Sequence, residues 1–227
     1  GLTEKRQTRF YASFALCLSA TIGLAFSANL LTFFLFYEVL TVATYPLVTH
    51  KGNSEALAAG RKYLTYLITG GVLLLCAIGY TYYVAGTLDF KAGGLLPSDV
   101  GSSSLVVLFS LFLIGFGFKS AIMPLHSWLP SAMVAPTPVS ALLHAVAVVK
   151  AGVFGLVRSI GFVLGPEKLH EAGLLVIMLV LAAITIIMAS LLALKQDNLK
   201  ARLAYSTIGH LSYIVLGIVV IIGGFLL

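Results

Sequence analysis

Charged residues are scarce in this sequence. Of its 227 residues, 14 are Lys or Arg and 8 are Asp or Glu, so charged residues make up 10% of the chain against 59% hydrophobic residues. A water-soluble domain normally carries about 25% charged residues. With a mean hydropathy of +1.05, this shortage excludes both a disordered chain and an ordinary soluble globule. Several apolar runs reach the roughly 20 residues that a bilayer-spanning helix needs, so the sequence predicts an all-α, polytopic membrane protein.

Motifs for metals, cofactors and nucleic acids are also missing. The two cysteines, Cys17 and Cys76, lie far apart in apolar runs and in no CxxC spacing, which is typical of cysteines that act as small hydrophobes. No two histidines have the i, i+4 spacing of a metal or haem site, and no Walker, GxSxG or Rossmann glycine pattern occurs. No basic cluster is long enough to follow phosphates, despite the net charge of +6. We therefore expect no metal, no cofactor and no nucleic-acid partner.

Seven apolar spans are predicted. They lie at residues 10–28, 30–49, 63–86, 105–123, 139–164, 173–194 and 205–226. The stretch from Pro124 to Pro138 contains four prolines and no charged residue yet stays rather apolar, which indicates a broken helix and a re-entrant turn buried in protein. Thr137 and Pro138 suit the N-cap and the first position of the fifth helix. The chain starts without Met and stops inside an apolar run, as expected for a fragment of a longer protein.

Basic residues are distributed unequally between the two ends of these spans. The N-terminal end has nine and the opposite end has three, namely Lys5, Arg6, Arg9, Lys51, Arg61, Lys62, Lys195, Lys200 and Arg202 against Lys91, Arg158 and Lys168. Loops on the cytoplasmic side of membrane proteins carry an excess of Lys and Arg. The sequence therefore predicts that the N-terminal side of the chain is cytoplasmic.

Three charges remain inside the apolar spans: Glu38, Lys119 and Lys150. A charge that faces lipid at the centre of a helix costs about 2.5 kcal/mol or more, so all three are expected to face protein or water. Taken singly, Lys119 would snorkel to the interface, Glu38 would be a protonated packing residue, and Lys150 would belong to a structural ion pair. Taken together, they would form a proton relay. A carboxylate about 4 Å from a lysine stabilises the ammonium by about 4 kcal/mol at an effective dielectric near 20, so movement of Glu38 would load or unload the proton of Lys119.

Three histidines are weaker candidates for this relay. His144 lies in the fifth span, but six residues before Lys150 and thus about 120° away around an ideal helix. The two would not share a face, and relay and packing roles for His144 remain equally open. His126, beside Trp128 in the proline-rich stretch, would serve equally as a cap or a hydrogen-bond partner. His210, in the seventh span, would be a relay residue or an interhelical hydrogen-bond partner.

Long stretches around these charges resemble one family of membrane subunits. They are LLTFFLFYEVLTVATYPLVTHKGN, GFGFKSAIMPLHSWLPSAMVAPTPVSALLHAVAVVKAGVFGLVR and LKQDNLKARLAYSTIGHLSYIVLGI. They are similar to the antiporter-like subunits of Mrp-type cation/proton antiporters, respiratory complex I and membrane-bound hydrogenases. The resemblance covers residues 10 to 220. It implies two inverted five-helix repeats: residues 1–164 would be the first, with a broken fourth helix, and residues 165–227 would begin the second.

The resemblance also implies roles and partners. Glu38 and Lys119 would be the pair of the first half-channel, and Lys150 the central lysine that passes protons onward. The chain would be a proton-translocating subunit of a monovalent cation/proton antiporter, of the D type in the Mrp complex, in a bacterial cytoplasmic (inner) membrane. It would work with other subunits, with Na⁺ or K⁺ as the candidate ions exchanged for protons, and would contain only the first half-channel. The alternatives are a proton-pumping subunit of complex I or of a membrane-bound hydrogenase, a structural subunit held by buried ion pairs, and a quinone-binding subunit.

Overall fold

The computed structural model describes residues 6–225, and their side chains as far as residue 222. Lys5, counted above on the N-terminal side, and residue 226, the end of the last predicted span, lie outside the described residues. Within the described part of the chain, seven helical segments are long and apolar enough to cross a membrane. The prediction of an all-α protein with seven membrane spans is therefore confirmed.

Six spans are single helices, and the fifth is built from four pieces. The single helices are α1 (Gln7–Ala25), α2 (Leu30–Val48), α3 (Ser54–Ala85), α4 (Ser102–Ser120), α9 (Leu174–Leu194) and α10 (Leu199–Phe225). The fifth span comprises α6 (Thr137–Ala141), the π-helix η2 (Leu142–Val146), α7 (Val148–Ser159) and the π-helix η3 (Ile160–Leu164). Short helices occupy connections: α5 (Trp128–Ser131), the 3₁₀ turn η1 (Ala132–Val134) and α8 (Pro166–Glu171).

Two helices begin earlier than their predicted spans. α3 begins at Ser54 rather than at residue 63, and α10 begins at Leu199 rather than at residue 205. Asparagine side chains stabilise both starts, because Asn53 and Asn198 each accept a backbone N–H from the first turn at 2.9 Å. Hydropathy identifies the membrane-embedded part of a helix, so these polar first turns were not predicted.

The break in the fourth membrane-spanning unit lies where the prolines predicted it. α4 is continuous to Ser120, the chain from residue 121 to residue 127 is non-helical, and α5 follows. The predicted cap of the fifth span is wrong by one residue. Pro136, which has an extended backbone with ψ 150°, takes the N-cap position, so that Thr137 and Pro138 are the first two helical residues.

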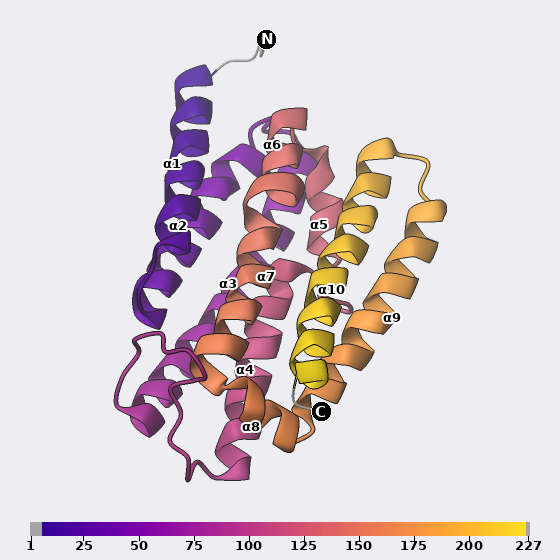
Figure 1. Cartoon of the computed structure of the whole chain (residues 1–227). Helices are drawn as coiled ribbons and strands as arrows, with labels where there is room; N and C mark the ends of the chain where they lie inside the picture. Colours follow the sequence, from indigo (N-terminus) through magenta and orange to yellow (C-terminus); the bar gives the residue numbers. More distant parts are fainter. Residues whose placement is uncertain (1–5, 226–227) are drawn as a thin grey trace.

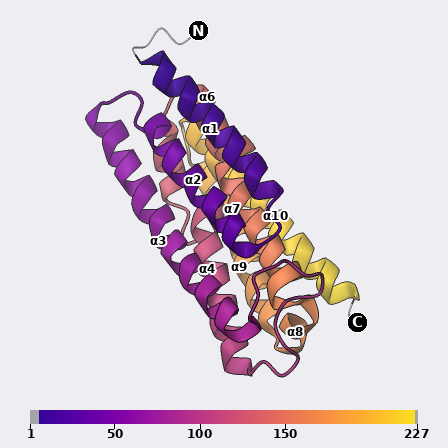
Figure 2. The ribbon, with the colours of Figure 1, turned by 90° about the vertical axis from the view of Figure 1, so that its left-hand side faces the viewer.

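The helices pack as antiparallel neighbours around α4 and α7. α1 packs on α2, α3 on α4, α4 on α7, and α9 on α10. Figures 1 and 2 show the N-terminus of α1, the α9–α10 connection and α6 at one end of the molecule. The long loop after α3 and the short helix α8 lie at the other end. The first of these ends is called the N-terminal end below.

Basic side chains fasten the opposite end. The Arg158 guanidinium donates to the backbone carbonyl of Ser27 at 2.7 Å and lies 4.3 Å from the centre of the Phe90 ring. The Lys168 ammonium donates to the carbonyls of Leu96 and Pro97 in the long loop. These bonds join the α1–α2 turn and the long loop to the end of the fifth span, which leaves the N-terminal end as the more open one.

Candidate functional site

Lys119 is a fully buried charge in the middle of the helix bundle. It lies in the last turn of α4 and is 1% exposed. Its ammonium donates a hydrogen bond to the Tyr37 carbonyl oxygen at 2.7 Å and lies 3.3 Å from the centre of the Tyr37 ring. A cation over an aromatic face gains about 0.5–2 kcal/mol. The alternative that Lys119 snorkels to the membrane surface is therefore wrong, because α2 holds its ammonium inside the protein.

Glu38 follows Tyr37 on α2 and directs its carboxylate towards α3. The residue is half-buried, and its Oε1 atom is buried without a hydrogen-bond partner among the described residues. A Cβ atom placed on Gly71 of α3 would lie 2.6 Å from this oxygen. The Glu38 carboxylate and the Lys119 ammonium interact electrostatically. A buried oxygen without a partner is costly, so Glu38 is well placed to accept a proton.

The backbone of Lys119 is fixed from the side opposite to α2. A Cβ atom on Gly152 of α7 would lie 2.4 Å from the Ser120 backbone nitrogen and 2.9 Å from the Lys119 carbonyl carbon. Glycine at this position therefore allows α7 to contact the α4 backbone directly. Tyr37, Gly71 and Gly152 were not predicted as site residues, since their importance depends on neighbours from other helices.

Lys150 does not join this pair in the described structure. Its side chain is exposed on the side of α7 and lines a recess of about 180 Å³ against Thr21 and Leu24 of α1. The expectation that all three charges face the interior of this chain is therefore wrong for Lys150. Position within an apolar run gives the depth of a residue in the membrane but not the face of the helix on which it lies.

The three candidate histidines lie apart from the pair and from one another. His144 is in the π-helix η2, where its Nδ1 atom lies 3.4 Å from the Thr207 hydroxyl of α10. The ideal-helix angle used above does not apply there, although His144 and Lys150 do face different neighbours. The Nδ1 atom of His126 is buried without a partner among the described residues. His210 is exposed and donates to the Ser206 carbonyl of its own helix at 2.7 Å, so its hydrogen bond is not interhelical.

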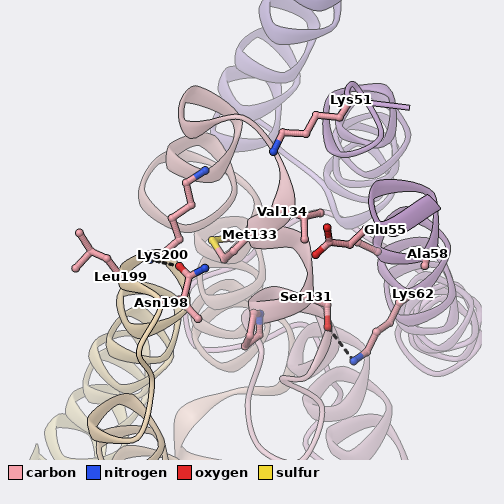
Figure 3. Close-up of a pocket in the computed structure, with 13 residues that line it drawn as sticks. Lys51, Glu55, Ala58, Lys62, Ser131, Met133, Val134, Asn198, Leu199 and Lys200 are labelled. Atoms are coloured by element: carbon pink, nitrogen blue, oxygen red, sulfur yellow. Dashed lines mark hydrogen bonds between the residues drawn. The ribbon is translucent and has the colours of Figure 1, made fainter. Parts of the chain in front are cut away.

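A cavity opens at the N-terminal end of the molecule. It has a volume of about 760 Å³ and lies between the start of α3, the α5–η1 segment and the start of α10 (Figure 3). Its polar and charged lining residues are Lys51, Glu55, Lys62, Ser131, Asn198 and Lys200. It is called the basic cavity below, because three of these six side chains are lysines and one is acidic.

Hydrogen-bonded side chains lead from the basic cavity towards α4. The Lys62 ammonium donates to the Ser131 hydroxyl at 3.0 Å, and this hydroxyl donates to the Ser127 carbonyl at 2.9 Å. The Ser127 hydroxyl shares a hydrogen bond of 2.7 Å with the Tyr66 hydroxyl. The Tyr66 ring packs edge-on against Phe118, whose centroid is 5.8 Å away and which precedes the buried lysine. This polar series was not predicted, because its members come from segments about 60 residues apart.

Comparisons with known proteins agree with the geometry. Residues 27–225 match the family described as NADH:quinone oxidoreductase/Mrp antiporter, transmembrane. The NAD(P)H-quinone oxidoreductase chain 4 2 of Microcystis aeruginosa is 34% identical over 217 residues, which cover 95% of this chain and 38% of the relative. The chain thus spans less than half of that protein.

Two solved structures share the fold over almost the whole chain. One is the membrane-bound sulfane sulfur reductase, an archaeal respiratory membrane complex, with a TM-score of 0.86, 27% identity, and coverage of 96% of this chain and 44% of the other. The second is the Mrp complex from Dietzia sp., with a TM-score of 0.84, 30% identity, and coverage of 93% and 23%. Relatives of this chain are thus subunits of multisubunit membrane complexes.

Proposed function

We propose, from the premise that this chain belongs to the NADH:quinone oxidoreductase/Mrp antiporter transmembrane family, that it translocates protons as a membrane subunit of a multisubunit monovalent cation/proton antiporter. Glu38 and Lys119 are the pair that exchanges the proton. The observation that carries the proposal is a fully buried ammonium that interacts with a carboxylate whose buried oxygen has no partner among the described residues.

The pair suits proton exchange because transfer changes no net charge inside the protein. A proton that moves from the Lys119 ammonium to the Glu38 carboxylate converts two buried ions into two neutral groups. The attraction between the ions reaches about 4 kcal/mol at about 4 Å, and about 1.4 kcal/mol is a factor of ten in an equilibrium. A displacement of the carboxylate by an ångström or so therefore changes the proton occupancy of Lys119 severalfold.

Protons reach the pair from the basic cavity in this proposal. The series Lys62, Ser131, Ser127 and Tyr66 supplies exchangeable hydrogens from the cavity wall to the ring of Phe118, beside the buried lysine. The excess of basic residues at this end supports a cytoplasmic location for it. The protein then lies in a bacterial cytoplasmic membrane and takes up protons from the cytoplasm.

Lys150 is the proposed acceptor beyond this pair. A lysine that faces outward from the middle of a span needs protein or water against it, so a neighbouring segment or subunit has to cover the recess between α1 and α7. Residues 1–164 then form a first repeat and residues 165–227, with the hairpin of α9 and α10, the beginning of a second. Lys150 passes protons across that boundary.

The family offers two settings for the same chemistry. Similarity to the Mrp complex structure supports exchange of protons for Na⁺ or K⁺, whereas curated relatives named as NADH-quinone oxidoreductase subunits support proton pumping driven by NADH oxidation. The two are distinguished by the driving force. In inverted membrane vesicles, the antiporter changes the pH gradient when Na⁺ or K⁺ is added, and the oxidoreductase builds it when NADH is added.

The proposal is tested by proton flux in such vesicles, with the full-length protein in its native complex. Glu38→Gln and Lys119→Met should each lower the flux at least tenfold, because each removes one partner of the exchange. Glu171→Gln and Lys195→Met are the matched controls, since both residues are exposed outside the pair, and should leave the flux unchanged. Wild-type flux in both Glu38→Gln and Lys119→Met would overturn the proposal.

A structural role for the pair makes a different prediction. Buried ion pairs can be replaced by apolar residues of similar size with little loss of stability. If Glu38 and Lys119 only hold helices together, the double variant Glu38→Leu/Lys119→Met should assemble and transport protons normally. The proton-exchange role predicts that the double variant assembles and does not transport.

A further inference from the structure

The basic cavity has more positive charge than proton uptake requires. Three lysines and one glutamate line it, from the start of α3 and the start of α10. Figure 3 shows the ammonium groups of Lys51 and Lys200 directed towards the same space across the mouth of the cavity. The carboxylate of Glu55 lies deeper, between Lys51 and Lys62 in the view of Figure 3. With all four groups ionised, the lining has a surplus of two positive charges.

Backbone dipoles add to this surplus. The N-terminal turns of α3 and α10 both contribute lining residues, Glu55 to one side and Leu199 to the other. The N-terminus of a helix carries a partial positive charge of about half an elementary charge and unpaired N–H groups. Two such termini beside three ammonium groups make a potential that favours an anion.

The lysines retain hydrogen-bond donors for a ligand. An ammonium has three N–H donors. In the described residues, Lys62 donates to the Ser131 hydroxyl and Lys200 donates to the Ala135 carbonyl at 2.9 Å. These bonds fix the two side chains against the α5–η1 segment and leave further donors on each. The cavity volume of about 760 Å³ lies within the range of about 300–1,000 Å³ that is typical of small-molecule sites.

We propose that the basic cavity binds a phosphate-bearing anion, with Lys51 and Lys200 as its main ligands and the N-termini of α3 and α10 behind them. Phosphate is the anion that this donor set suits, since ammonium groups and helix N-termini are its usual partners. The cavity lies at the end of the membrane spans, where phospholipid headgroups are found. The phosphate therefore comes from an anionic lipid or from solution, and the site does not depend on proton translocation by the Glu38–Lys119 pair.

The site is tested with two probes on the full-length protein in its complex. The first is a photoactivatable phosphatidylglycerol in nanodiscs of phosphatidylcholine, with cross-linked peptides mapped along the chain. The second is inorganic phosphate, with binding followed by the broadening of its ³¹P resonance. Each is applied to the wild type, to Lys51→Gln/Lys200→Gln, and to Lys195→Gln. Lys195 is a matched control because it lies at the same end, is exposed, and does not line the cavity.

The outcomes separate the two sources of phosphate. Cross-links to residues 51–62 and 198–201 that fall at least fivefold in the double variant, and not in the Lys195→Gln control, support a lipid phosphate. Broadening of the inorganic phosphate resonance that is lost in the double variant alone, without lipid cross-links, supports a soluble phosphate. Absence of both signals in the wild type, or signals that persist undiminished in a folded double variant, would overturn the proposal. Thermal unfolding of each complex shows whether the variant is folded.

Discussion

A methyl group on Gly71 should separate the proton-exchange function from folding. In Gly71→Ala the new Cβ atom would lie 2.6 Å from Oε1 of Glu38 and 2.9 Å from its Cδ atom, whereas C···O contacts are normally about 3.3 Å or longer. The carboxylate must therefore move by about 0.7 Å. Overpacking of this kind costs about 1–3 kcal/mol, which depopulates the native carboxylate position by about fivefold to 150-fold.

The stability of the complex should change little in the same variant. Ala is favoured over Gly inside a helix by about 1 kcal/mol, which offsets much of the contact cost. Gly79→Ala is the matched control, because Gly79 lies on the same helix and a Cβ atom there meets nothing within 4 Å. We expect proton flux in vesicles to fall at least fivefold in Gly71→Ala and to stay unchanged in Gly79→Ala, with both complexes unfolding near the wild-type temperature.

A second variant keeps this prediction testable if Gly71→Ala assembles poorly. Glu38→Asp shortens the acid by one methylene group and withdraws the carboxylate from α3. The double variant Glu38→Asp/Gly71→Ala should therefore transport no more slowly than Glu38→Asp alone, because residues in contact are not additive. Wild-type flux in a folded Gly71→Ala complex, or strictly additive losses in the double variant, would refute the assigned contact between Glu38 and α3.

Three other variants probe the remaining contacts of the proton path. Gly152→Ala places a Cβ atom 2.4 Å from the Ser120 backbone nitrogen, which no side-chain rotation relieves, so the thermal stability and yield of the complex should fall, and a wild-type unfolding temperature would contradict the close contact of α7 with α4. Tyr66→Phe removes the hydrogen bond to Ser127, of a kind worth about 0.5–1.5 kcal/mol, so proton uptake should slow by about twofold to tenfold; Tyr80→Phe, which loses its bond to Ser104 elsewhere on α3, should not slow it, and equal rates in the two variants would count against the uptake route. Lys150→Gln should abolish flux without lowering the unfolding temperature, because Lys150 is exposed in this chain, and normal flux would remove Lys150 from the proton path.

The sequence predicts depth in the membrane better than it predicts facing. Seven spans follow from hydropathy because each spanning helix needs about 20 apolar residues, and the prolines after Lys119 predict the break before α5. The same reasoning treats Lys119 and Lys150 alike, since both lie within apolar runs. Only the packing of α7 on α4 separates them, because it buries the backbone of Lys119 and leaves the side chain of Lys150 exposed.

Irregular helices set a second limit. The angle of about 120° between His144 and Lys150 holds for a straight α-helix, but η2 is a π-helix and changes the register between them. Nothing in the local pattern of small and apolar residues from Leu142 to Val146 distinguishes a π-turn from an α-turn. Likewise, Ser127, Ser131 and Tyr66 form no motif in the sequence, and their hydrogen bonds exist only because α5 folds back against α3.

The most direct test of the account is to detect the transferred proton on Glu38. Infrared difference spectra of the full-length complex, recorded between the resting and the energised state, report the C=O stretch of a protonated carboxyl group. We predict a carboxyl band that appears on energisation, is lost in Glu38→Gln, and shifts in Lys119→Met because the neighbouring ammonium is removed. A carboxyl band that is identical in the wild type and in Glu38→Gln would show that Glu38 does not carry the proton, and would contradict the central claim.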